Sequence, residues 1–101
     1  MPTLEIDARD LATVQQILRR HIPDRVVLAF GSRATHTAKP FSDLDLAVLG
    51  DDPLASHLLG ALRDDFDVSD LPFKVDIVDW ATTHAGFRKI IERDGVLLLK
   101  P

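Results

Sequence analysis

Residues 30–50 read FGSRATHTAKPFSDLDLAVLG, and this stretch decides the fold. A Gly-Ser pair at residues 31–32 follows an apolar run, and a polar loop then leads to the sequence SDLDL at residues 42–46. Side chains alternate between the two faces of a strand, so Asp43 and Asp45 project from the same face, about 6.5–7 Å apart at their Cα atoms. Two acids held side by side where an apolar strand begins are unfavourable unless a cation lies between them.

The apolar periodicity on either side of this stretch predicts one domain over residues 1–101. The nine-residue loop from Arg33 to Phe41 is too short for a crossover helix, so the strands that flank it are expected to be antiparallel. The prediction is an α/β (α+β) fold in the order α-β-β-α-β-α-β, with a mixed four-stranded sheet and helices packed on it. The expected elements are helices over 8–21, 53–66 and from Thr82 or Thr83 to Gly95, and strands over 26–30, 43–49, 73–80 and 96–99.

Several single residues support these boundaries. Asp7 is expected to cap the first helix, and Pro53 is placed in the first turn of the second helix. In the last helix the apolar residues Phe87, Ile90 and Ile91 are expected to face the sheet.

The composition restricts the possible functions of the chain. Its 101 residues include 12 Lys+Arg and 16 Asp+Glu, a net charge of −4 that argues against a general nucleic-acid surface. The chain contains no cysteine, which rules out disulfides and thiolate chemistry and is typical of a reducing cytosol. No stretch resembles a signal peptide or a membrane span. A cytoplasmic location is therefore expected.

Asp43 and Asp45 are candidate metal ligands. Carboxylates at this spacing can bridge two divalent ions, and hard oxygen ligands favour Mg²⁺ or Mn²⁺ over zinc. A lone Asp-x-Asp is more often a solvated strand start, and a lone Gly-Ser is more often a plain turn. Together they place the phosphate-binding groups of Gly31 and Ser32 beside metal ligands, at the adjoining ends of two paired strands. That combination is much rarer than either part.

A third acid lies in the segment LPFKVDIVDW, residues 71–80. Asp76 interrupts an otherwise apolar strand, and an ionised residue there is costly unless it is partnered, which indicates that it serves a site. Asp79 has the opposite strand parity, so it is expected to end the strand or cap the next helix.

Three motifs together resemble the minimal nucleotidyltransferases of the DNA polymerase β superfamily. The motifs are Gly31-Ser32-Arg33-Ala34, Ser42-Asp43-Leu44-Asp45-Leu46 and Val75-Asp76-Ile77. The resemblance spans nearly the whole chain and implies a polymerase β-like nucleotidyltransferase core. His36 stands where the family often has glycine.

The resemblance implies a two-metal transfer of a nucleotide from an NTP, with ATP as the expected donor. Asp43, Asp45 and Asp76 would be the catalytic residues. Asp43 and Asp45 would ligate both Mg²⁺ ions, and Asp76 would complete the site of the metal that lowers the pKa of the acceptor hydroxyl and could act as the general base. Gly31 and Ser32 would hold the β- and γ-phosphates. Arg33 could reach a phosphate or pair with a nearby acid.

The resemblance also implies a partner. Small members of this superfamily are commonly paired with a helical HEPN protein, and several such pairs behave as toxin–antitoxin modules in which the nucleotidyltransferase adenylylates its partner. The expected acceptor is a hydroxyl on a protein or RNA. Because the sequence ends at Pro101, directly after the predicted core, the acceptor is expected to dock onto the catalytic module or to arrive with a partner.

Two other functions remain as alternatives. The chain could be a non-catalytic binding module, an antitoxin that masks its partner while the nucleotide site stays idle. A nucleic-acid polymerase is disfavoured, since the sequence lacks the basic surface and extra domains that it would need.

Overall fold

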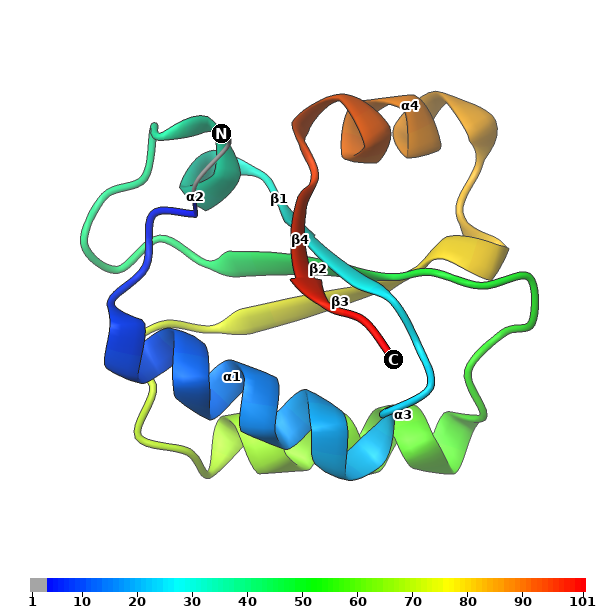
Figure 1. Cartoon of the computed structure of the whole chain (residues 1–101), viewed down its shortest axis with the longest axis horizontal. Helices are drawn as coiled ribbons and strands as arrows, with labels where there is room; N and C mark the ends of the chain where they lie inside the picture. The colour runs from blue at the N-terminus through cyan, green and yellow to red at the C-terminus, as the bar shows by residue number, and fades with distance from the viewer. Residues whose placement is uncertain (1–3) are drawn as a thin grey trace.

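The computed structural model describes residues 4–101, which form a mixed sheet covered by helices (Figure 1). The strand order is β3-β2-β1-β4. β1 pairs antiparallel with both β2 and β4, whereas β2 and β3 are parallel. The predicted antiparallel first pair and the mixed four-stranded sheet are therefore confirmed. The strands are β1 (Val27–Phe30), β2 (Leu44–Val48), β3 (Val75–Asp79) and β4 (Val96–Leu99).

Helices cover both faces of the sheet. Helices α1 (Ala8–His21) and α3 (Ser56–Asp67) lie on one face, and α4 (Ala85–Asp94) lies on the other (Figure 1). The larger core lies between the sheet and the helices α1 and α3. It includes the fully buried Val14, Leu18, Leu44, Leu46 and Leu62. A smaller core beneath α4 contains Phe30, Ala47 and Ile91. Within residues 4–101 no helix is both long and apolar enough to cross a bilayer.

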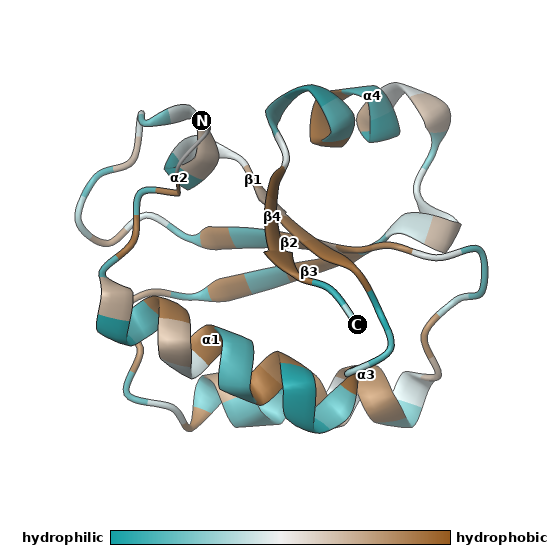
Figure 2. Ribbon diagram, viewed as in Figure 1, coloured by the Kyte–Doolittle hydropathy of each residue, from teal (hydrophilic) through white to brown (hydrophobic). Residues whose placement is uncertain are grey.

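The first helix and the last strand agree with their predicted bounds. α1 begins where expected because the Asp7 side chain accepts a hydrogen bond from the Arg9 amide. The other three strands are each shorter than predicted. Figure 2 shows hydrophilic residues interrupting β2 and β3 near their starts, whereas β1 and β4 are largely hydrophobic.

The second predicted helix begins later than expected. α3 starts at Ser56, so Pro53 lies outside it. The segment before it is held in a non-helical path, since Arg25 donates to the carbonyls of Leu49 and Asp52, and the Leu54 amide donates to Asp79 at 2.8 Å. These tertiary hydrogen bonds override the local preference of proline for a first helical turn.

The cap of α4 also differs from the prediction. The hydroxyls of Thr82 and Thr83 donate to the carbonyl of Asp79, and the N-cap is His84, whose Nδ1 accepts from the Phe87 amide. As predicted, Asp79 ends β3 and caps the short 3-10 helix η1 (Trp80–Thr82). Ile90 does not face the sheet: 41% of it is exposed.

A one-turn helix, α2 (Ser32–Thr35), lies where an irregular loop was expected. Four residues are too few to show an apolar period, so no pattern in the sequence indicates it. It ends at His36, whose φ of 60° is in the left-handed region.

Candidate active site

The three predicted acids lie on the α4 face of the sheet. The β2–β3 ladder pairs Asp45 directly with Asp76, and paired residues project from the same face. Leu44 and Leu46 point into the core beneath α1 and α3, so Asp45 between them points to the opposite face. Asp43 is two residues before Asp45 and shares its side. The structure therefore brings the candidate residues together at the start of β2 and β3.

The three acids also act on one another electrostatically. Burial raises the pKa of the half-buried Asp45 carboxyl above its usual value, and the charges of Asp76 and then Asp43 raise it further. Lys74 Nζ lies 3.7 Å from Asp76 Oδ1, but the lysine side chain is 72% exposed, so it compensates the charge of Asp76 only weakly. Asp45 is thus held among like charges.

The donor set fits a hard divalent cation. Three carboxylates supply oxygen ligands, and a cation between them would relieve the repulsion that raises the pKa of Asp45. The side chains share one face without closing around a common centre: within residues 4–101 no three acids or histidines are gathered as tightly as metal ligands are. Binding of a cation would therefore need side-chain rotation.

The turn after β1 lies directly against these acids. Phe30 is paired with Asp45, and the next residue, Gly31, has a φ of 76°. A Cβ at this position would overlap the carboxylate of Asp45. Only glycine combines this backbone conformation with such a close approach. The Gly-Ser turn and Asp45 thus lie at adjoining ends of two paired strands, as predicted, and Ser32 follows as the first residue of α2.

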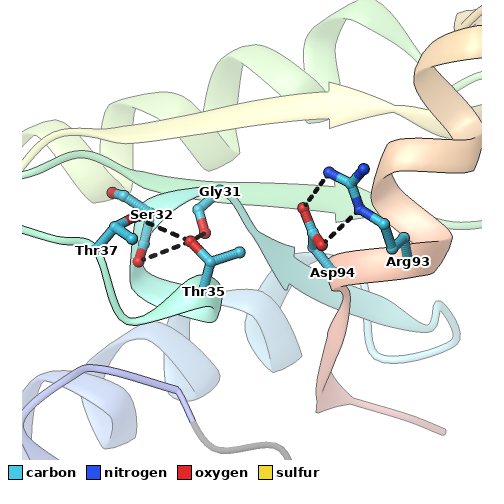
Figure 3. Close-up of polar contacts among 6 residues, drawn as sticks. All are labelled: Gly31, Ser32, Thr35, Thr37, Arg93 and Asp94. Atoms are coloured by element: carbon cyan, nitrogen blue, oxygen red, sulfur yellow. Dashed lines mark hydrogen bonds and ion pairs between the residues drawn. The ribbon is translucent and has the colours of Figure 1, made fainter.

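Thr35 stabilises this turn. Figure 3 shows its hydroxyl near the carbonyl oxygens of Gly31 and Ser32, at 3.3 and 3.5 Å, and 3.0 Å from the hydroxyl of Thr37. Serine and threonine hydroxyls commonly bond the carbonyls three or four residues earlier. The backbone of the turn is thereby fixed beside Asp45 without any contribution from a ligand.

Arg33 does not occupy the position that was predicted for it. The residue is 6% exposed, and its guanidinium donates to the carbonyls of Ser42 (2.9 Å), Glu5 (3.0 Å) and Pro40 (3.2 Å). It also stacks on the ring of Phe73 at 4.3 Å. Because its donors are engaged with backbone, Arg33 holds the loop that leads into β2, in place of the predicted contact with a phosphate or an acid.

Two further charged groups near the turn were missed by the sequence analysis. The β1–β4 ladder places Val96 opposite Ala29, which brings the end of α4 to the side of Gly31. Figure 3 shows Arg93 and Asp94 there, joined by two hydrogen bonds of 3.0 and 3.1 Å. Nothing in the sequence indicates this position, because it depends on which strand β4 pairs with.

A large hollow in the described part of the chain is separate from the acids. It measures about 570 Å³ and lies between residues 4–7 and 38–40, beside Arg33. None of Asp43, Asp45 and Asp76 lines it. The candidate site therefore lies outside this hollow, and substrates would be held by the turn and the acids.

The chain is similar to known proteins in sequence and structure. Residues 12–101 match the family described as polymerase beta, nucleotidyltransferase. A relative, the probable protein adenylyltransferase MntA of Haemophilus influenzae, is 45% identical over 95 residues, which cover 94% of this chain and 83% of the relative. A crystal structure of a toxin–antitoxin with AMP-PNP has a TM-score of 0.75 at 27% identity, and the match covers 91% of this chain and 74% of that one.

A further solved structure shares the fold. It contains the tri-AMPylated Shewanella oneidensis HEPN toxin in complex with its MNT antitoxin, and the matching chain has a TM-score of 0.68 at 24% identity. The match covers 92% of this chain and 71% of that one.

Proposed function

The chain belongs to the polymerase β-type nucleotidyltransferase family, and we propose that it transfers AMP from ATP, with Mg²⁺, onto a hydroxyl group of a partner protein. The observation that carries this proposal is the position of Asp45, half-buried beside Asp76 and against the turn at Gly31. A protein with no use for a cation gains nothing from acids held so close together. The similarity to a probable protein adenylyltransferase supports protein as the acceptor.

Each residue has a defined part in the proposed reaction. Gly31 allows the turn to approach, so that backbone amides and the Ser32 hydroxyl can hold the β- and γ-phosphates. Asp43, Asp45 and Asp76 would hold two Mg²⁺ ions, which when bound neutralise phosphate charge and lower the pKa of the acceptor hydroxyl. Asp76 lies on the edge strand β3, with its side chain 44% exposed, and accepts the proton of the acceptor hydroxyl.

The bonds that change follow from this arrangement. The acceptor oxygen forms a bond to the α-phosphorus of ATP, and the bond from that phosphorus to the oxygen bridging the β-phosphate breaks. The acceptor becomes adenylylated and pyrophosphate leaves on the side of the Gly31 turn.

The proposed partner is a helical HEPN-type protein, with this chain as the antitoxin of the pair. The similarity to MntA and to a toxin–antitoxin crystallised with AMP-PNP supports this role. Adenylylation would silence the partner by placing a bulky, charged group on it.

The test is transfer of labelled AMP to unmodified HEPN toxin, read by intact mass. The wild-type chain is expected to add AMP, and Asp45→Asn to reduce the rate by about a hundredfold or more because a ligand charge is lost. The control is Asp70→Asn, which makes the same charge change at an exposed position outside the site. Equal transfer by Asp45→Asn would contradict the proposal. Tight toxin binding without any MgATP binding would favour the masking antitoxin instead.

A further inference from the structure

We propose that the acceptor docks along the free edge of β3 as an extended polypeptide, which pairs with this strand and presents its hydroxyl to Asp76. The inference rests on the proposed function and specifies the acceptor side of the same site. It starts from the strand order, in which β3 is an edge strand. The free edge is the side of β3 away from β2.

The order of groups across the sheet gives the direction of approach. The Gly31 turn lies at the end of β1, Asp45 is on β2 and Asp76 is on β3, so the three follow one another toward the open edge. If the phosphates are held at the turn, Asp76 is the acid farthest from them in this order. An acceptor that loses its proton to Asp76 therefore approaches from the edge of β3.

A groove is present at this edge. It has a volume of about 320 Å³, and α3 contributes Arg63 and Asp67 to its wall. On the sheet side it is lined by Lys74, Val75, Asp76 and Ile77. At about 3.3 Å per residue, the part formed by β3 is long enough to pair with three or four residues of an extended chain.

The backbone of β3 is oriented for such pairing. The Leu44 amide donates to the carbonyl of Lys74 at 2.9 Å, so Lys74 directs its backbone toward β2. Backbone groups alternate along a strand, and those of Val75 and Ile77 therefore face the free edge. These are the groups that an added strand would bond.

The same alternation places the acceptor side chain. Because Asp76 directs its backbone toward β2, a residue opposite it on an added antiparallel strand forms a non-hydrogen-bonded pair. Side chains in such pairs are the closest across a sheet, with Cβ atoms about 4.5–5.5 Å apart. A serine, threonine or tyrosine at this position would lie beside the Asp76 carboxylate, on the face that carries Asp45.

Charge at the groove selects the acceptor segment. Lys74 is 72% exposed and precedes Asp76 by two residues on the same face, and Arg63 is exposed on α3. An acidic side chain two residues from the acceptor hydroxyl would lie opposite Lys74. A hydroxyl-bearing segment with a nearby acid is therefore the expected occupant. RNA fits less well, because its phosphates would meet Asp67 and Asp76 in the same groove.

A site-directed block tests this inference. The chain contains no cysteine, so Arg63→Cys can be labelled with a bulky maleimide at that position alone. We expect the label to reduce kcat/KM for unmodified Shewanella oneidensis HEPN toxin by about tenfold or more, as expected for loss of about 1.4 kcal/mol of acceptor binding. The affinity for MgATP should stay unchanged. The control is Arg19→Cys with the same label, on the exposed side of α1.

The outcomes separate this inference from the proposed function. Undiminished transfer by the labelled Arg63→Cys variant would overturn the docking site. The unmodified toxin and an RNA with a free 3′ end are offered separately as acceptors to the wild-type chain. AMP transfer to the RNA, or to neither acceptor when the chain binds MgATP, would overturn the polypeptide acceptor. Absence of MgATP binding by the wild-type chain would instead contradict the proposed function itself.

Discussion

Replacing Asp45 with asparagine should stabilise the fold while removing the cation site. The folded state raises the pKa of Asp45 above the ordinary value of 3.8 through burial and through the charges of Asp76 and Asp43. Folding therefore favours the neutral acid over the carboxylate. The cost of the charge is fully present above the folded-state pKa, decreases as the pH falls through that pKa, and is absent below the unfolded value.

The pairing of β2 with β3 allows an estimate of how much Asp45→Asn stabilises the fold. Asp45 and Asp76 are directly paired, and adjacent strands are about 4.8 Å apart, so their mutual repulsion is about 1–3 kcal/mol at effective dielectric constants of 80 to 20. Solvent screening at a half-exposed site reduces this to about 1 kcal/mol. For a domain of this size, such a gain raises Tm by about 4–8 °C.

The assay is thermal unfolding at neutral pH and near pH 3, with and without Mg²⁺. Without Mg²⁺, Asp45→Asn should exceed the wild type in Tm at neutral pH, and the difference should vanish near pH 3. Added Mg²⁺ should raise the Tm of the wild type and leave the variant unchanged, because ligands stabilise only the state that they bind. Asp70→Asn serves as the matched control. A lower Tm for Asp45→Asn at neutral pH, or the same gain for Asp70→Asn, would refute the electrostatic argument.

Three further changes test other parts of the structure. Gly31→Ala should weaken MgATP binding at least about tenfold and destabilise the fold by about 1–3 kcal/mol, because the new Cβ overlaps Asp45 at a positive φ. Calorimetry measures the binding, and urea unfolding measures the stability. Unchanged binding would argue against the turn as the phosphate site. Arg33→Lys should lower the free energy of unfolding by about 2–4 kcal/mol, as measured in urea, because an ammonium cannot make the three hydrogen bonds that the guanidinium donates to carbonyls. Unchanged stability would contradict the structural role of Arg33. The hydrogen bond of Asp65 to His21, and then that to Arg20, lower the pKa of Asp65, so its stabilising contribution is present above 3.8 and is lost as the pH falls through the lowered value. In Asp65→Asn, the free energy of unfolding should therefore decrease less steeply at acidic pH than in the wild type. The same pH dependence in both proteins would exclude this contribution.

Local patterns predicted much of the fold. The bounds of α1 agree with prediction because the Asp7 cap and the apolar period act within one helix. The parity of Asp76 and Asp79 also placed these two acids correctly, one beside Asp45 and the other at the end of β3. Alternation along a strand is a backbone property, so the sequence shows that the two acids differ in face. The choice of Asp76 as the site residue also depended on the resemblance to the family.

The errors occur where distant residues decide the structure. Pro53 lies outside α3 because Arg25 and Asp79, remote in sequence, hold the preceding segment in a non-helical path. Arg33 was expected at a phosphate or a nearby acid, but it is buried and bonds the carbonyls of Glu5, Pro40 and Ser42, whose positions no local pattern specifies. The groove beside Asp76 likewise depends on β3 being an edge strand, which follows from the strand order and not from its own residues.

The most direct test of the proposed site is paramagnetic broadening by Mn²⁺ in an NMR spectrum of the protein with an ATP analogue. We expect the amide signals of residues 31–32, 43–45 and 75–76 to broaden first, and this pattern to be lost in Asp45→Asn. Broadening centred on the other acidic residues, at 64–70, or the same pattern in Asp45→Asn, would contradict the assignment of Asp43, Asp45 and Asp76 as the metal and nucleotide site.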